Sequence, residues 1–175
     1  MQTLVMKTLL SLLLSFFIIL QVDAQTIYMV RHGEKSSAEG VDLKNPPLSD
    51  KGLNRAKDLQ KTLADKNIEV IYVTSTIRSN LSAAEVAKAK NLKPTVYHPM
   101  PDLKWIQSVI DSKIDVLIVA HSNTISHIYN LILEAVGKDK KDFEHPEDSY
   151  NVLYMFDWNK SKVMQMKEIT YGENN

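Results

Sequence analysis

The stretch Thr26–Lys35 reads Thr-Ile-Tyr-Met-Val-Arg-His-Gly-Glu-Lys. Its first half, Ile27–Val30, is a short apolar run rich in β-forming residues, which is typical of a buried strand. The run stops at Arg31, where four residues begin that a hydrophobic core does not accommodate. Open α/β sheets bind ligands at the carboxyl ends of their strands. The stretch therefore predicts a strand that carries a ligand site at its end; the alternative is a surface turn that contains Arg and His.

The three residues that directly follow the apolar run, Arg31, His32 and Gly33, are suited to binding an anionic ligand. Arg31 has a forked set of donors that matches phosphate oxygens. His32 can be neutral near pH 7 and so act as a nucleophile or a base. Gly33 permits a tight turn and a close approach of backbone N–H groups to an anion.

The composition indicates one globular domain. Of the 175 residues 44% are hydrophobic, and 21 basic residues balance 21 acidic ones, so no general basic field favours nucleic acid. The absence of cysteine excludes disulfides, thiolate metal sites, a cysteine nucleophile and a lipid-modified cysteine anchor. Three of the 21 basic residues are Arg31, Arg55 and Arg78, and the other 18 are Lys. Each arginine is therefore expected to do what lysine cannot, such as bidentate binding of an oxyanion.

Residues Met1–Ala24 have the pattern of a signal peptide. Lys7 supplies a positive n-region, Thr8–Leu20 is mostly apolar, and Val22-Asp23-Ala24 places small residues where a signal peptidase reads them. We expect cleavage after this segment and a single domain over residues 25–175, exported to the periplasm or secreted, without membrane attachment after cleavage. The alternative is an uncleaved amino-terminal anchor.

Strand and helix patterns alternate along the rest of the chain. Further strands are predicted at Glu69–Val73, Thr95–Tyr97 and Asp115–Ala120, and two alternating runs around Asn159-Lys160, Tyr150–Asp157 and Lys162–Thr170, predict a hairpin. Helices are predicted from Ser49 or Asp50, after Arg78 to about Ala89, over Asp102–Ser112, and after His121 to Gly137. The fold class is α/β: a three-layer sandwich with a largely parallel central sheet flanked by helices and a C-terminal hairpin.

Two of these helices carry specific expectations. The first is expected to bury Leu53, Ala56, Leu59 and Leu63, while Gly52 in its first turn suggests close packing or a role beside the ligand. The last is expected to be capped by Ser122 or Asn123, which leaves free N–H groups and the positive helix end beside His121.

Three strand ends thus present Arg31-His32, Arg78 and His121. Two arginines and two imidazoles in one pocket suit a dianionic phosphoryl group, whose oxygens need several fixed donors.

These segments resemble the signature of the histidine phosphatase superfamily, the fold of phosphoglycerate mutases and related phosphatases. Four motifs that occur in the same order as in the family are a specific signal, whereas any one of them alone would be a weak one. They cover most of the chain after the leader: Arg31-His32-Gly33-Glu34, Pro46-Pro47-Leu48-Ser49-Asp50-Lys51-Gly52 with Ala56, Thr74–Arg78 with Ser82-Ala83, and His121-Ser122-Asn123-Thr124.

The resemblance implies a phosphatase mechanism that needs no metal and no cofactor. His32 would attack phosphorus and become phosphohistidine, which water then hydrolyses. Arg31 and Arg78 would hold the phosphoryl oxygens, and His121 would donate a further hydrogen bond. We expect further contacts to the substrate from Gly33, Glu34, Ser122 and Asn123.

The proton donor for the leaving group stays open. The large insert that carries the general-acid Glu in mutase-like branches is absent, and Ser122 follows His121 where another branch has Asp. Glu34 and Asp102 are the candidates, and a good leaving group needs no acid. The short segment between Arg78 and His121 leaves little lid, so an open pocket for a phosphorylated small molecule, an envelope glycan or a phosphopeptide is expected.

Two other functions are compatible with the same residues. The chain could be a mutase or a phosphohistidine phosphatase of the same superfamily, although an export signal disfavours both. It could also be a phosphate- or glycan-binding module with an inactive pocket. The sequence does not indicate an oligomeric state.

Overall fold

The computed structural model describes residues 25–158 and 164–173. The signal segment 1–24 and the hairpin turn at Asn159-Lys160 lie outside these residues, so both stay predictions. Within the described part, one sheet holds strands in the order β3-β2-β4-β1-β5-β6. The strand bounds are β1 Thr26–Arg31, β2 Ile68–Val73, β3 Thr95–Val96, β4 Asp115–Ala120, β5 Val152–Trp158 and β6 Met164–Thr170.

The first four strands run parallel, so the carboxyl ends of β1, β2 and β4 meet at one edge of the sheet. Arg31 lies level with Ala120 across the β1–β4 pair. Strand β5 pairs antiparallel with β1, and β6 pairs antiparallel with β5, which forms the predicted C-terminal hairpin. Strands β1 and β4 are buried along almost their whole length, as expected for strands covered on both faces.

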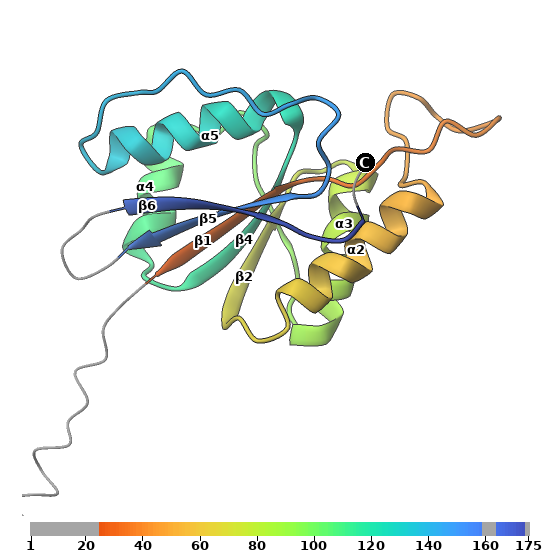
Figure 1. The fold of residues 1–175 in the computed structure, drawn as a ribbon, viewed down its shortest axis with the longest axis horizontal. Coiled ribbons are helices and arrows are strands. Elements are labelled where there is room, and N and C mark those ends of the chain that lie inside the picture. The colour runs from red at the N-terminus through yellow and green to blue at the C-terminus, as the bar shows by residue number, and fades with distance from the viewer. Residues whose placement is uncertain (1–24, 159–163, 174–175) are drawn as a thin grey trace, which may run out of the picture.

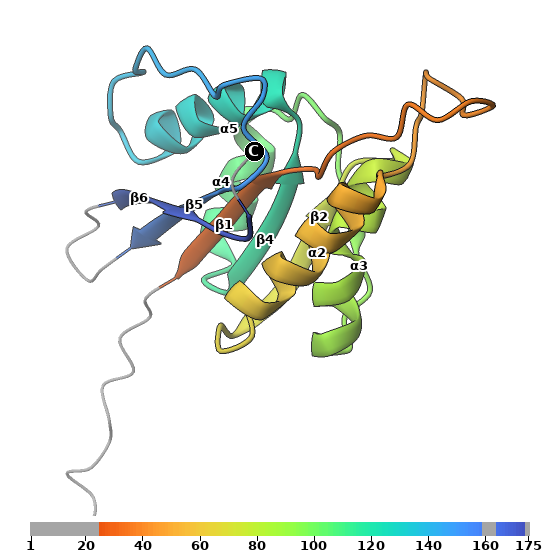
Figure 2. The same ribbon diagram turned by 45° about the vertical axis from the view of Figure 1, so that its right-hand side comes forward.

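Helices cover both faces of the sheet and make the three layers that were predicted. Helices α2 and α3 lie side by side on one face, and α4 and α5 lie on the other (Figures 1 and 2). Their bounds are α2 Asp50–Thr62, α3 Ile77–Lys90, α4 Leu103–Asp111 and α5 Ser122–Ala135. Among the residues that the structure describes, no helix is both long and apolar enough to cross a membrane.

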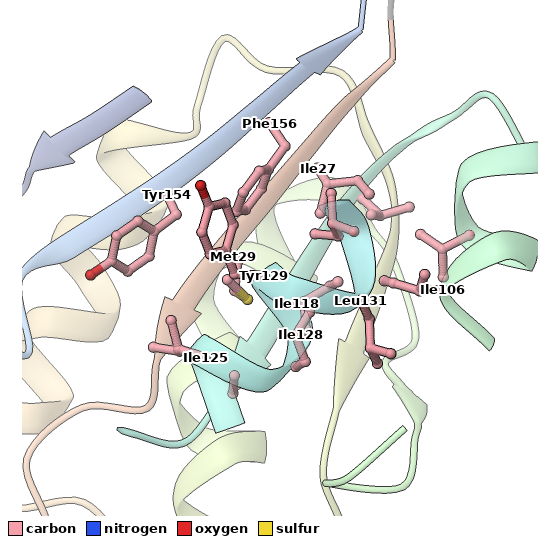
Figure 3. Close-up of a cluster of buried hydrophobic side chains, with 14 of the residues drawn as sticks. Ile27, Met29, Ile106, Ile118, Ile125, Ile128, Tyr129, Leu131, Tyr154 and Phe156 are labelled. Carbon is pink, nitrogen blue, oxygen red and sulfur yellow. The ribbon is translucent and has the colours of Figure 1, made fainter. Parts of the chain in front are cut away.

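Each face of the sheet has its own core, because successive side chains of a strand point to opposite sides. Ile27 and Met29 of β1 enter the core beneath α4 and α5, which Figure 3 shows. Tyr28 and Val30 enter the core beneath α2 and α3. Strand β1 is therefore held from both sides, and the residues that follow it are fixed at the sheet edge.

The buried face of α2 differs from the prediction. Leu53 is 40% exposed, whereas Ala56 and Leu59 are buried as expected and Leu63 is buried at the C-cap. Arg55 shares the buried face instead, at 4% exposure, because it is paired with a carboxylate described below. Ser49 is the N-cap, and its hydroxyl accepts a hydrogen bond from the Gly52 N–H at 3.2 Å.

The start of α5 also differs from the prediction. The N-cap is His121, and not Ser122 or Asn123, because β4 ends at Ala120 and the helix begins at once. Thr124 completes the turn: its hydroxyl accepts a hydrogen bond from the His121 N–H at 3.0 Å. His121 is thus held at the junction of a buried strand and a helix.

Candidate active site

The structure brings the two histidines of the predicted site into contact. The His32 N–H donates to the Ala120 carbonyl at 3.0 Å, which extends the β1–β4 pairing by one residue. Ala120 directly precedes His121, and the two imidazole rings meet edge to face with centroids 5.0 Å apart. Arg78, from the first turn of α3, reaches the same point: its Nε donates to His32 Nε2 at 3.2 Å.

The hydrogen bonds of His32 define which ring nitrogen carries the lone pair. Nδ1 lies 2.8 Å from the Gly33 carbonyl, which can only accept, so we assign the proton to Nδ1. Nε2 then carries the lone pair, and the Arg78 Nε–H points at it. A lone pair beside a guanidinium is arranged to attack an electrophile that the same guanidinium binds.

Both imidazoles are neutral at neutral pH. Burial lowers the pKa of His32 to about 3, against the hydrogen bond to Gly33, and His121, Arg78 and Arg31 lower it further. Burial and then Arg78 and Arg31 lower the pKa of His121 to about 4. A neutral imidazole keeps its lone pair, which nucleophilic attack requires.

The two arginines each keep one buried N–H group without a partner. Arg31 donates Nη1–H to the Glu147 carbonyl and Nη2–H to the Tyr150 hydroxyl at 3.1 Å, and its guanidinium lies 3.9 Å from the centre of the Tyr150 ring. Within residues 25–158 and 164–173, its Nε has no hydrogen-bond partner, and neither has Nη1 of Arg78. Buried donors are nearly always paired in native proteins, so two unpaired guanidinium donors beside one imidazole indicate an anion site.

Thr74 fixes the ring of His121. Its hydroxyl lies 3.0 Å from His121 Nε2 and 3.0 Å from the Thr76 hydroxyl, and the Thr74 side chain is buried. The sequence indicated Thr74 only as part of a motif and gave it no role. The signal that was available is its position at the end of β2, level with the other strand ends.

Two buried serines of α3 hold the surrounding backbone. The Ser82 hydroxyl accepts from the Gly33 N–H at 2.9 Å and donates to the Arg78 carbonyl at 2.8 Å. The Ser79 hydroxyl donates to the Val119 carbonyl at 3.1 Å. The turn after β1, the start of α3 and the end of β4 are therefore joined by side-chain hydrogen bonds.

Glu34 is turned toward Arg55. The Arg55 Nε–H lies 3.0 and 2.8 Å from the two carboxylate oxygens, and Nη2 lies 2.5 Å from Oε1. Although burial alone would raise the pKa of Glu34, these hydrogen bonds hold it below its usual range. Glu34 is therefore a poor proton donor at neutral pH, and its carboxylate is engaged with protein and not with the phosphoryl site. Arg55 therefore binds an oxyanion bidentately, as expected, but this oxyanion is the Glu34 carboxylate of the same chain and not a ligand.

Gly52 packs closely, as its position in the sequence suggested. A Cβ atom at Gly52 would collide with the Glu34 carbonyl and lie 2.9 Å from the Glu34 nitrogen. A Cβ atom at Gly33 would lie 3.0 Å from the Gly52 carbonyl oxygen. The start of α2 therefore presses on the turn that carries the nucleophile.

The other predicted site residues, Asp102, Ser122 and Asn123, lie at the starts of α4 and α5. Asp102 is the N-cap of α4, and its carboxylate accepts from the Trp105 N–H at 2.9 Å. Ser122 and Asn123 are in the first turn of α5 directly after His121, Ser122 half-buried and Asn123 exposed. Contact of either residue with a substrate stays a prediction.

The remaining surface adds no further chemistry at this edge. Among residues 25–158 and 164–173, no three His, Asp or Glu side chains are grouped so that they could hold a metal ion. A surface cavity of about 480 Å³ shares no residue with the His–Arg cluster. It is lined by Lys51, Asn54, Arg55, Lys57, Asp58, Lys61 and Glu173.

Comparison with known sequences places three of the four residues of the His–Arg cluster inside a family match. The family model of the histidine phosphatase superfamily (branch 1) matches residues 27–107, which include Arg31, His32 and Arg78. Phosphoserine phosphatase 1 of Hydrogenobacter thermophilus is 36% identical over 70 residues, which are 38% of this chain and 33% of that protein. The chain thus matches about a third of the length of that relative.

Solved structures show the same fold at low sequence identity. The protein histidine phosphatase SixA, solved with tungstate, gives a TM-score of 0.59 at 16% identity over 83% of this chain and 96% of that one. A phosphoserine phosphatase from Entamoeba histolytica gives 0.60 at 10% identity over 86% and 98%. A mycobacterial glucosyl-3-phosphoglycerate phosphatase gives 0.58 at 10% identity over 86% and 100%.

The mixed sheet between two helical layers, with its His–Arg cluster at the strand ends, defines an α/β protein of the phosphoglycerate mutase-like fold. The family match over the strand, turn and helix that carry His32 and Arg78 makes the assignment more specific. The family match over residues 27–107 and the shared fold support the histidine phosphatase superfamily for this chain.

Proposed function

We propose that the protein hydrolyses phosphomonoesters through a phosphohistidine on His32, without a metal or a cofactor. One observation carries the proposal: the lone pair of a neutral, buried imidazole faces the Arg78 guanidinium, and both Arg78 and the adjacent Arg31 keep a buried N–H without a partner among the described residues. A bound phosphoryl group would accept from both N–H groups while Nε2 faces its phosphorus atom.

The residues divide the work as follows. His32 Nε2 attacks phosphorus in line with the leaving oxygen, the N–P bond forms, and the P–O bond breaks. Arg31 and Arg78 stabilise the charge on the equatorial oxygens. Thr76 and Thr74 can donate in sequence to His121 Nε2, which leaves the Nδ1–H of His121 to donate to the phosphoryl group. Water then cleaves the N–P bond, and phosphate leaves.

The location and the substrate class are part of the same proposal. The leader pattern over residues 1–24 supports export to the periplasm or the medium. The named relatives act on different phosphorylated compounds, which supports a phosphate-directed pocket whose leaving-group side varies. We propose a phosphorylated small molecule or an envelope glycan as the substrate.

The test is turnover of 4-nitrophenyl phosphate by the wild type and by His32→Ala, in the presence of a metal chelator. We expect wild-type turnover, a loss of at least about 10³-fold in the variant, and an acid-labile phosphoryl adduct on His32 after rapid quenching. Inactivation by the chelator would refute metal independence.

The alternative of a binding module makes a different prediction. It is favoured by the engagement of Glu34 with Arg55, which removes one candidate acid from the pocket. Inorganic phosphate would then bind the wild type and His32→Ala about equally, with no turnover by either. That result would overturn the proposed hydrolysis.

A further inference from the structure

The described pocket lacks an evident proton donor for the leaving group. An alkoxide is a poor leaving group, and protonation by a positioned acid contributes about 10²–10⁴-fold. Glu34 is bound by Arg55, and the Asp102 carboxylate caps α4. A donor for alkyl phosphates has to come from another part of the chain.

The segment 145–150, between α5 and β5, passes directly over Arg31. His145 anchors it: the buried imidazole is 2.8 Å from the Tyr154 hydroxyl through Nδ1 and 2.9 Å from the Ser149 carbonyl through Nε2. The Ser149 N–H donates to the Pro146 carbonyl at 3.1 Å, which closes a turn around residues 147 and 148. This turn is therefore fixed in place and not a loose part of a polar insert.

Glu147 is the residue of this turn that contacts the pocket arginine. Its carbonyl accepts Nη1–H of Arg31, and the neighbouring Tyr150 hydroxyl accepts Nη2–H. Arg31 is 6% exposed and keeps its Nε unpaired, whereas the Glu147 side chain is exposed. The backbone of Glu147 thus contacts the buried Arg31, whereas its side chain is exposed to solvent.

The leaving group belongs on that same side. His32 is buried and attacks from the protein side, and in-line displacement sends the leaving oxygen away from the nucleophile, toward solvent.

We propose that Glu147 is the general acid that protonates the leaving oxygen of alkyl phosphates, an inference that rests on the proposed hydrolysis at His32. As the N–P bond forms and the P–O bond breaks, the electron pair goes to the leaving oxygen, which takes the proton of the Glu147 carboxyl group. In the second step the Glu147 carboxylate takes a proton from water, hydroxide adds to phosphorus, and the N–P electron pair returns to His32. Glu147 is then protonated again, and inorganic phosphate and the alcohol are the products.

The test compares substrates whose leaving groups differ in acidity. 4-Nitrophenol leaves without help, whereas the serine hydroxyl of phosphoserine needs a proton. In Glu147→Gln we expect kcat/KM for phosphoserine to fall about 100-fold or more, and that for 4-nitrophenyl phosphate to fall less than about fivefold. Competitive inhibition by inorganic phosphate should be unchanged, because glutamine keeps the backbone contact to Arg31. Glu144→Gln, three residues away and also exposed, is the matched control and should leave both substrates unaffected.

Each other outcome overturns the inference in a recognisable way. Equal losses on both substrates in Glu147→Gln would show that the residue only positions Arg31, while the hydrolysis itself would stand. A selective loss in Asp148→Asn, with Glu147→Gln active on both, would assign the proton to the adjacent carboxylate. If the wild type hydrolyses neither substrate, both the proposed hydrolysis at His32 and the assignment of Glu147 as general acid are wrong.

Discussion

Replacement of Tyr150 tests how Arg31 is held in the pocket. The Tyr150 hydroxyl accepts Nη2–H of Arg31 at 3.1 Å, and its ring lies 3.9 Å from the guanidinium carbon. Tyr150→Phe removes the hydrogen bond and keeps the ring, whereas Tyr150→Leu removes both contacts. The two variants therefore separate the hydrogen bond from the cation–π interaction.

The magnitudes follow from the two contacts. A hydrogen bond to a charged group contributes about 1.5–3 kcal/mol, and because Tyr150 is only half-buried, water can replace part of it. We take the lower end, about 1.5 kcal/mol, which is roughly a tenfold loss in kcat/KM for Tyr150→Phe. The cation–π interaction adds about 1 kcal/mol, so Tyr150→Leu should lose roughly 70-fold in kcat/KM.

The assay is steady-state turnover of 4-nitrophenyl phosphate together with the inhibition constant of inorganic phosphate. Both should weaken in the order wild type, Tyr150→Phe, Tyr150→Leu, with unfolding temperatures close to that of the wild type. Tyr72→Phe is the matched control, because Tyr72 packs against Trp105 beneath α4 with ring centroids 5.2 Å apart. If Tyr150→Phe matches the wild type in both constants, the assignment of Tyr150 as a positioning residue for Arg31 is wrong.

Three further predictions concern the fold around the pocket. Because burial lowers the pKa of His32 from 6.5 to about 3, the unfolded chain binds a proton that the folded one rejects in this range. Stability should fall as pH drops below 6.5, by about 2 kcal/mol at pH 5 from this residue. Urea titrations of the wild type and His32→Gln in phosphate-free buffer measure this, and identical pH slopes would contradict it. Thr74→Val leaves His121 Nε2 without its hydroxyl partner, so kcat/KM should fall about tenfold; Thr74→Ser should retain most activity, and equal activity of Thr74→Val would exclude the role. Gly52→Ala forces a methyl group against the backbone of Glu34, and chemical denaturation should show a loss of about 1–3 kcal/mol; an unchanged midpoint would mean that the turn relaxes freely.

The parts of the site that follow directly from strand ends were accessible from the sequence. Arg31 and His32 end one apolar run, and His121 follows another, Asp115–Ala120, so their meeting at one edge follows from parallel pairing of the two strands. Arg55 was expected to bind an oxyanion because it is one of three arginines among many lysines. It does bind one, but the partner is Glu34 from the same chain.

Other features depend on contacts that no local pattern encodes. Leu53 fits a helical stripe, but the buried position is taken by Arg55, whose charge is neutralised by a residue 21 positions away. Glu147 lies in a polar segment without periodicity, and Tyr150 stands just after that segment, at the start of a predicted strand. Their approach to Arg31 is decided by β5 pairing with β1, a contact between distant parts of the chain.

Arg31 joins the two ends of the folded chain. It closes the first strand, yet the groups that hold its guanidinium are Glu147 and Tyr150, 116 and 119 residues later. A chain that is folded only through α5 already contains His32 and Arg78, but Arg31 lacks the groups that orient its guanidinium. The site is therefore completed only when residues 147–150 dock on Arg31, and loss of this segment would leave His32 beside an arginine that is not held in place.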